Sequence, residues 1–141
     1  HSPDAFAKTL AAVRKVTSGR ILMVFGASGD RDASKRPEMG RVAAHGADVV
    51  IVTDHHPRHE EPAGIRKTLI ESARAERPDL ELYELVPPEA AIRKAVELAK
   101  PGDSILWSGP GHLDYREIKG VKVPFTARDE ARAALREAGY L

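Results

Sequence analysis

The sequence predicts an α/β domain with a mostly parallel sheet flanked by helices. Two observations support this. Short apolar runs that suit buried strands alternate with longer segments in which apolar residues recur at helical spacing. Polar or glycine-bearing loops follow these apolar runs. Strands joined through helices in this way pair in parallel, and their crossovers are right-handed.

The chain begins with a helix signal. Residues 2–4 (Ser-Pro-Asp) supply a capping hydroxyl, a proline suited to the first helical position and an acid in the first turn. We expect this helix to end at Gly19. The apolar run 21–25 that follows is too short for a typical helix and predicts a buried strand.

The next segment repeats the pattern. A polar loop, 26–36, leads to a helix with Pro37 in its first turn, which we expect to stop at Gly46. Residues 48–53 are rich in β-branched side chains and predict a second strand. Its loop covers 54–62.

The pattern then continues to the last parallel strand. Apolar residues four apart over 65–73 predict a third helix, and 80–86 predicts a strand partly buried on both faces. A fourth helix buries apolar residues over 92–99. Residues 104–107 predict a strand that ends in the loop 108–114.

The end of the chain adds an antiparallel element. Residues 115–125 predict a hairpin, which turns at Lys119 and Gly120. A last helix starts at Thr126, with Asp129 as its capping-box partner. The whole reads as one Rossmann-like domain, 1–141, with this hairpin at one edge of the sheet.

The parallel arrangement makes a functional prediction. Parallel strands place the loops that follow them on one rim, so we expect 26–36, 54–62 and 108–114 to lie together. The unusual polar residues of the chain gather in these loops. The sequence therefore predicts a site for a polar ligand on this rim.

Composition excludes several classes of function. Net charge is +1 over 141 residues, which does not indicate a nucleic-acid or membrane surface. The chain has no cysteine, no apolar run of membrane-spanning length and no visible signal peptide, so we expect a cytoplasmic protein. Gly26 and Gly29 complete neither a dinucleotide fingerprint nor a phosphate loop.

Two arginines are the best candidate ligand-binding residues. Arg31 and Arg58 can each clamp a carboxylate or phosphate with two parallel hydrogen bonds, although exposed loop arginines would give the same pattern. The glycines of 109–111 would let backbone approach a ligand, or make a plain tight turn. No catalytic set of a nucleophile and a base stands out.

A metal site is the weaker interpretation of the histidines. His55, His56, His59 and His112 lie in two rim loops, and imidazole suits zinc. However, the first three lack helical i, i+4 spacing, and Arg58 among them would repel a cation. We therefore expect no metal here and histidines that line a pocket or face solvent.

Four segments in this order resemble the C-terminal domain of the Mur ligases, which are ATP-dependent amino-acid ligases of peptidoglycan synthesis. Residues 1–5 resemble the end of a DYAHTPDA segment, and 25–37 resemble FGxGGDRDxxKRP. Residues 52–62 resemble VTDDNPRxExP, and 109–115 resemble GKGHEDY. The resemblance covers nearly the whole chain and is strongest to members that add the third residue of the stem peptide.

The resemblance implies a reaction for the full-length enzyme. ATP would phosphorylate a carboxylate of a UDP-N-acetylmuramoyl dipeptide, and the amine of a free amino acid would attack the acyl phosphate. ATP and Mg²⁺ would be bound mainly by a central domain that this chain lacks. The chain alone would be inactive, and would close over that central domain while holding the incoming amino acid.

Site residues follow from the resemblance position by position. Arg31, Arg58 and Gly109 match positions that contact the incoming amino acid, and the arginines would hold its carboxylates. His1 matches a histidine near the nucleotide. Enzymes specific for meso-diaminopimelate carry Asp-Asn immediately before the Pro-Arg pair that contains the second arginine.

This chain departs from that pattern at the residues that read the amino acid. It has His55 and His56 in place of the Asp-Asn pair, Pro110 in place of a lysine, and Leu113 in place of a glutamate that helps hold the distal amine. An ammonium without its carboxylate is costly to bury. Meso-diaminopimelate, lysine, ornithine or another third residue stays open, and Leu113→Glu should shift the preference of the parent enzyme.

Two alternatives remain. A folylpolyglutamate-type or cyanophycin-type ligase would share the architecture, although the loops at 29–32 and 56–58 fit it less well. A stand-alone Rossmann-like binding module, using the histidines, would belong to another class. A phosphate loop ahead of His1 would separate a ligase from such a module.

Overall fold

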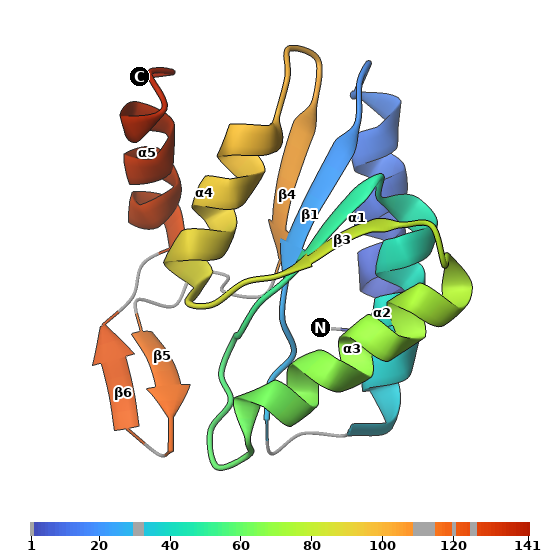
Figure 1. Ribbon diagram of the computed structural model, residues 1–141, viewed down its shortest axis with the longest axis vertical. Coiled ribbons are helices and arrows are strands. Elements are labelled where there is room, and N and C mark those ends of the chain that lie inside the picture. Colours follow the sequence, from blue (N-terminus) through green and yellow to red (C-terminus); the bar gives the residue numbers. More distant parts are fainter. Residues whose placement is uncertain (1, 30–32, 109–114, 120, 125–126) are drawn as a thin grey trace.

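The computed structural model describes residues 2–29, 33–108, 115–119, 121–124 and 127–141. Its helices and strands alternate as the sequence predicts (Figure 1). In chain order they are α1 (Pro3–Lys15), β1 (Ile21–Phe25), η1 (Ala33–Lys35), α2 (Arg36–Gly46), β2 (Val49–Val52), α3 (Pro62–Glu76), β3 (Glu81–Glu84), α4 (Pro88–Leu98), β4 (Ser104–Ser108), β5 (Tyr115–Ile118), β6 (Val121–Pro124) and α5 (Ala127–Glu137).

The predicted parallel sheet is confirmed. Among the described residues, four strands pair in the order β3-β2-β1-β4, and every pair is parallel. Phe25 at the end of β1 lies opposite both Val52 of β2 and Ser108 of β4. The carboxyl ends of the three strands are therefore level, and the loops after β1 and β2 leave the same edge of the sheet.

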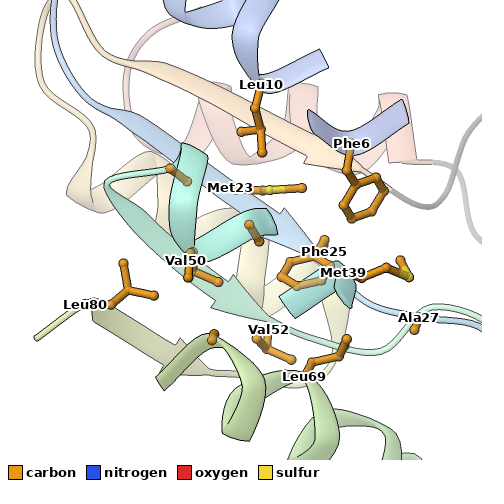
Figure 2. Close-up of a cluster of buried hydrophobic side chains, with 14 of the residues drawn as sticks. Phe6, Leu10, Met23, Phe25, Ala27, Met39, Val50, Val52, Leu69 and Leu80 are labelled. Atoms are coloured by element: carbon orange, nitrogen blue, oxygen red, sulfur yellow. The ribbon is translucent and has the colours of Figure 1, made fainter. Parts of the chain in front are cut away.

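Helices cover both faces of the sheet, and β1 and β2 are buried throughout. Helices α1, α2 and α3 pack on one face, where Phe6 and Phe25 meet edge to face and Leu69 is fully buried (Figure 2). Helices α4 and α5 cover the other face, where Val24 and Ile51 contribute to the core. Two-sided burial explains why these strands read as continuous apolar runs.

Strand β3 lies at one edge and is partly buried on both faces, as predicted. Leu82 packs toward the α1–α3 face, while Tyr83 and Leu85 pack toward the α4–α5 face. The strand is shorter than the predicted range 80–86: it ends at Glu84, so Val86 lies beyond it and is 45% exposed.

The prediction for the end of the first helix is wrong. Helix α1 ends at Lys15 instead of continuing to Gly19. The Thr17 hydroxyl donates to the Val13 carbonyl oxygen (2.6 Å), and the Gly19 N–H donates to the Gly102 carbonyl oxygen (2.8 Å). Gly19 therefore serves a close contact with the turn before β4, where a Cβ would lie 2.9 Å from the Gly102 oxygen.

The C-terminal hairpin forms, but it does not extend the edge of the main sheet as we expected. Strands β5 and β6 pair antiparallel in a separate two-stranded sheet (Figure 1). The hairpin turn contacts the loop after β2, where the Lys119 N–H donates to the Arg58 carbonyl oxygen (2.5 Å). Helix α5 begins at Ala127, and the predicted cap at Thr126 lies outside the described residues.

Candidate functional site

The candidate site lies at the carboxyl edge of the sheet, where strand order reverses. Strand β1 has β2 on one side and β4 on the other. The chain leaves β1 toward α2 on one face, and the connection from β2 through α3 leads to β3 on the same side. In open parallel sheets, ligands bind in the crevice at such a reversal. The loop after β1 lies at this reversal of strand order, and the loop after β2 packs against the loop after β1.

These two loops are in direct backbone contact. The Gly29 N–H donates to the His56 carbonyl oxygen (2.7 Å). A Cβ on Gly29 would lie 1.8 Å from the Pro57 carbonyl oxygen, and one on Gly26 would lie 2.5 Å from the Thr53 carbonyl oxygen. Only glycine allows the backbones to come this close. The prediction that the loops lie together is therefore borne out for this pair.

Arg58 lies at the contact between the loops. One guanidinium nitrogen, Nη1, donates to the Gly29 carbonyl oxygen (3.0 Å). The residue has a backbone φ of +54°, which lies in the left-handed region that residues other than glycine seldom adopt. Such backbone is costly, and it persists where surrounding contacts hold it. Its carbonyl oxygen accepts the bond from Lys119 of the hairpin.

A second arginine joins the same loops. Arg36, at the start of α2, is buried, and its guanidinium binds both carboxylate oxygens of Glu60 (2.8 and 2.9 Å). The same guanidinium donates to the Ser28 carbonyl oxygen (2.8 Å). A planar guanidinium can bridge a carboxylate and a carbonyl in fixed geometry. Arg36 therefore ties the loop after β1 to the loop after β2.

His55 and His56 are buried in the second loop. Their exposed fractions are 6% and 3%, and their ring centroids are 4.1 Å apart at an angle of 55°. The two rings are therefore packed against each other inside the loop. Of the two alternatives for these histidines, burial excludes the solvent-facing one for His55 and His56 and leaves the pocket-lining one.

Ion pairs hold the start of the loop after β2, which is the second of the two site loops. Arg66 of α3 donates to Asp54 (2.6 Å) and to Glu84 at the end of β3 (2.8 Å). Burial alone would lower the pKa of Arg66, but the two carboxylates outweigh it and keep this pKa above its usual value. Asp54 is thus engaged with Arg66, which fixes the start of the loop.

The structure brings together only part of the predicted site. Arg58, His55 and His56 share the loop after β2, which contacts the loop that carries Arg31 in the sequence. Four other predicted residues lie outside the described part of the chain: His1, Arg31, Gly109 and Leu113.

Sequence reasoning missed Arg36 and Glu60 as partners. Both stand in the resembling segments, at the Arg-Pro and Glu-x-Pro positions. Opposite charges in two segments expected on one rim were a usable signal. The specific pairing could not be deduced, because it depends on how closely the backbones approach each other.

The described residues show neither a metal-binding cluster nor a membrane-spanning helix. Within the described ranges, no group of three or more His, Asp or Glu side chains is arranged to hold a metal ion. No helix in the described part of the chain is long and apolar enough to cross a membrane.

Comparison with known proteins gives one family match. The family model described as the Mur ligase, glutamate ligase domain matches residues 1–111. That segment contains β1 to β4 and both loops of the candidate site.

Curated relatives match over nearly the whole chain. A UDP-N-acetylmuramyl-tripeptide synthetase of Leifsonia xyli subsp. xyli is 59% identical over 141 residues, which is 100% of this chain and 27% of that relative. A UDP-N-acetylmuramoyl-L-alanyl-D-glutamate–2,6-diaminopimelate ligase of Chelativorans sp. is 46% identical over 137 residues, or 97% of this chain and 27% of that ligase. The chain thus spans about a quarter of the length of these relatives.

A solved structure shares the fold over the whole chain. It is a UDP-N-acetylmuramoyl-L-alanyl-D-glutamate–2,6-diaminopimelate ligase, with a TM-score of 0.87 and 32% identity. The match covers 100% of this chain and 28% of that one. The parallel four-stranded sheet with helices on both faces is therefore an architecture that such a ligase contains.

Proposed function

Because this chain belongs to the Mur ligase family, we propose that it is the amino-acid-binding C-terminal domain of an ATP-dependent ligase. That ligase would add the third residue, a diamino acid, to UDP-N-acetylmuramoyl-L-alanyl-D-glutamate in peptidoglycan synthesis. The named relatives are all ligases of this substrate class, which favours this proposal over a folylpolyglutamate-type or cyanophycin-type ligase. A nucleotide-linked substrate and ATP imply that the reaction takes place in the cytoplasm.

The observation that carries the proposal is the contact between the two loops at Arg58. The side chain of Arg58 reaches Gly29, which precedes Arg31 by only two residues. Two arginines from separate loops would then serve one ligand, each with a fork that matches a carboxylate. A free amino acid carries at least one carboxylate.

The domain would act as a lid in this reaction. Its carboxyl edge, with both loops, would face the central domain of the same ligase and close over the bound nucleotide. Closure would bring the amine of the held amino acid toward the activated carboxylate of the UDP-N-acetylmuramoyl dipeptide, and orientation of this kind accelerates bimolecular steps. His1 would face the nucleotide, and Gly109 would approach the amino acid.

ATP and Mg²⁺ chemistry is assigned to other domains of the ligase. The described residues include no glycine-rich phosphate loop, and they bring no three metal-ligating side chains together. The described residues therefore offer no donor set for a nucleotide–metal complex, and we propose that the chain alone releases no ADP.

The histidine pair bears on which amino acid is added. Asp54 is paired with Arg66, and the next two residues are buried imidazoles instead of an acid and an amide. The second loop thus has no uncommitted aspartate for a distal ammonium, and Leu113 supplies no carboxylate. We propose that recognition of the distal group differs from that of meso-diaminopimelate ligases.

The test is ADP release by the intact ligase. The enzyme is given ATP, Mg²⁺, the UDP-N-acetylmuramoyl dipeptide and, in turn, diaminopimelate, lysine and ornithine. We expect release that depends on one amino acid, and Arg58→Lys should raise the KM for that amino acid about 10- to 100-fold because the fork is lost. Arg74→Lys, far from the site on α3, is the matched control.

Two outcomes would contradict the proposal. A folded wild-type enzyme that releases ADP with none of the amino acids would indicate another acceptor. An Arg58→Lys enzyme with unchanged KM would show that Arg58 does not hold the amino acid.

A further inference from the structure

We infer that Arg36 and Glu60 are positioning residues that set the orientation of Arg58 toward the incoming amino acid. The inference rests on the proposed function and extends it to two residues that do not themselves match ligand-contacting positions. Together they lock the loop after β1 against the loop after β2.

The geometry of Arg36 carries the first step. Its guanidinium makes three hydrogen bonds, two to the Glu60 carboxylate and one to the Ser28 carbonyl oxygen. The Arg36 side chain is 8% exposed, whereas that of Glu60 is 35% exposed. Because Arg36 belongs to α2, its hydrogen bonds tie one residue of each loop to that helix.

The fixed residues flank the site on both loops. Ser28 precedes Gly29, whose N–H and C=O bind His56 and the Arg58 side chain respectively. On the other loop, the Glu60 N–H donates to the Pro57 carbonyl oxygen (3.0 Å) and closes a turn around Arg58. Arg36 thus holds both the turn that contains Arg58 and the carbonyl that its guanidinium contacts.

The backbone of Arg58 needs such support. Its φ of +54° is an unfavourable conformation that relaxes when the neighbouring contacts loosen. A shift of about 1 Å in a substrate-holding group is enough to reduce a rate by about 100-fold. Loss of the Arg36–Glu60 lock should therefore weaken amino-acid binding without changing any group that touches the ligand.

Arg20 provides a matched control at the opposite end of the strands, where the parallel strands begin. Arg20 binds the Asp103 carboxylate (3.0 Å) and donates to the Leu98 carbonyl oxygen (2.8 Å). It repeats the chemistry of Arg36, one carboxylate and one carbonyl, at the start of β1 instead of its end. Arg20→Lys therefore reports what loss of such a network does to the domain as a whole.

The experiment compares Arg36→Lys, Glu60→Gln, Glu60→Asp and Arg20→Lys in the intact ligase. For each, the KM for the amino acid, ATP and the UDP-linked dipeptide is measured with kcat and the thermal midpoint. We expect Arg36→Lys and Glu60→Gln to raise the KM for the amino acid about 10-fold or more, with less than about a twofold change in the other two. Glu60→Asp, which keeps the carboxylate, should recover part of the loss, and Arg20→Lys should leave all three constants unchanged.

Hydrogen exchange provides a readout that is independent of turnover. In Arg36→Lys and Glu60→Gln, the amide of Gly29 should exchange faster, because its bond to His56 depends on the lock. The amide of Asp48, which bonds to the Ile21 carbonyl at the far end of β1, should keep its rate.

The outcomes distinguish failure of this inference from failure of the proposed function on which it rests. Wild-type enzyme without amino-acid-dependent ADP release would overturn both. If the wild-type enzyme is active but Glu60→Gln leaves the KM for the amino acid unchanged, the positioning role alone is overturned. The same holds if Glu60→Gln raises the KM values for the amino acid, ATP and the UDP-linked dipeptide equally. If Arg36→Lys does not fold, the milder Glu60→Gln and Glu60→Asp decide the matter.

Discussion

At the scale of single residues, glycine decides whether the two site loops can meet. The sequence shows Gly26 and Gly29 only as loop glycines that match no phosphate-binding motif. The structure gives their physical role, which is to let one backbone lie against another without a side chain between them. Gly29 is the tighter of the two, since its missing Cβ would overlap a carbonyl oxygen of the second loop.

Gly29→Ala should therefore destabilise the chain by about 1–3 kcal/mol, because either loop must move to admit a methyl group. Under the proposed function, the same change should also weaken amino-acid binding in the intact ligase. Gly64→Ala is the control: a Cβ there meets nothing within 4 Å, and alanine in α3 should stabilise the chain by up to about 1 kcal/mol. Chemical denaturation measures the free energy of unfolding of both variants. Equal changes in Gly29→Ala and Gly64→Ala would show that the contact at Gly29 is not tight.

At the scale of elements, a buried carboxylate joins the starts of β1 and β4. Asp103 accepts hydrogen bonds from the backbone N–H groups of Arg20 (2.7 Å) and Lys100 (2.9 Å), and from the Arg20 guanidinium. Its side chain is 4% exposed. The two backbone N–H groups, more than the guanidinium, hold the pKa of Asp103 below its usual value, although burial opposes them.

This arrangement predicts an acid-labile contribution to stability. A carboxyl whose pKa is lower in the folded chain stabilises it above the unfolded-state pKa of about 3.9, and this contribution is lost as pH falls through the folded-state pKa. Asp103→Asn should lower the free energy of unfolding at pH 7 and flatten its decline below about pH 4. Urea unfolding from pH 7 to pH 2 measures this, with the exposed Asp79→Asn as control. A parallel decline in wild type and Asp103→Asn would contradict the assignment.

At the scale of the whole molecule, the two helical layers are packed unequally. The α1–α3 layer encloses fully buried side chains such as Leu69. The α4–α5 layer leaves a cavity of about 530 Å³ against β4, lined mainly by apolar side chains that include Ile92, Trp107 and Leu135. Strand β4 is half-buried along its length, whereas β1 beside it is fully buried.

Truncations in the two layers should therefore differ in cost. Leu69→Ala should lower the free energy of unfolding by about 2–5 kcal/mol, because a closed core cannot refill the space. Leu135→Ala, at the open cavity, should lower the free energy of unfolding by only about 1 kcal/mol, because the Leu135 side chain is only partly removed from water. Denaturant titration of both variants tests this, and a larger loss for Leu135→Ala would show that the α4–α5 layer is the tighter one.

The sequence by itself determined the alternation of elements, the parallel sheet and the edge where the polar loops lie. These follow from local patterns: apolar runs such as 21–25, β-branched content over 48–53 and helix signals at Ser2 and Pro37. Its motifs also identified the family, whose model matches residues 1–111.

Only the tertiary structure decided which groups meet. The bridge from Arg36 to Glu60, the burial of the histidine pair and the use of Gly19 in a turn contact depend on distances between segments far apart in sequence. The hairpin pairs with itself and contacts Arg58 for the same reason. Local propensity sets what a segment forms, whereas the packing of complete elements sets which of its side chains another segment can reach.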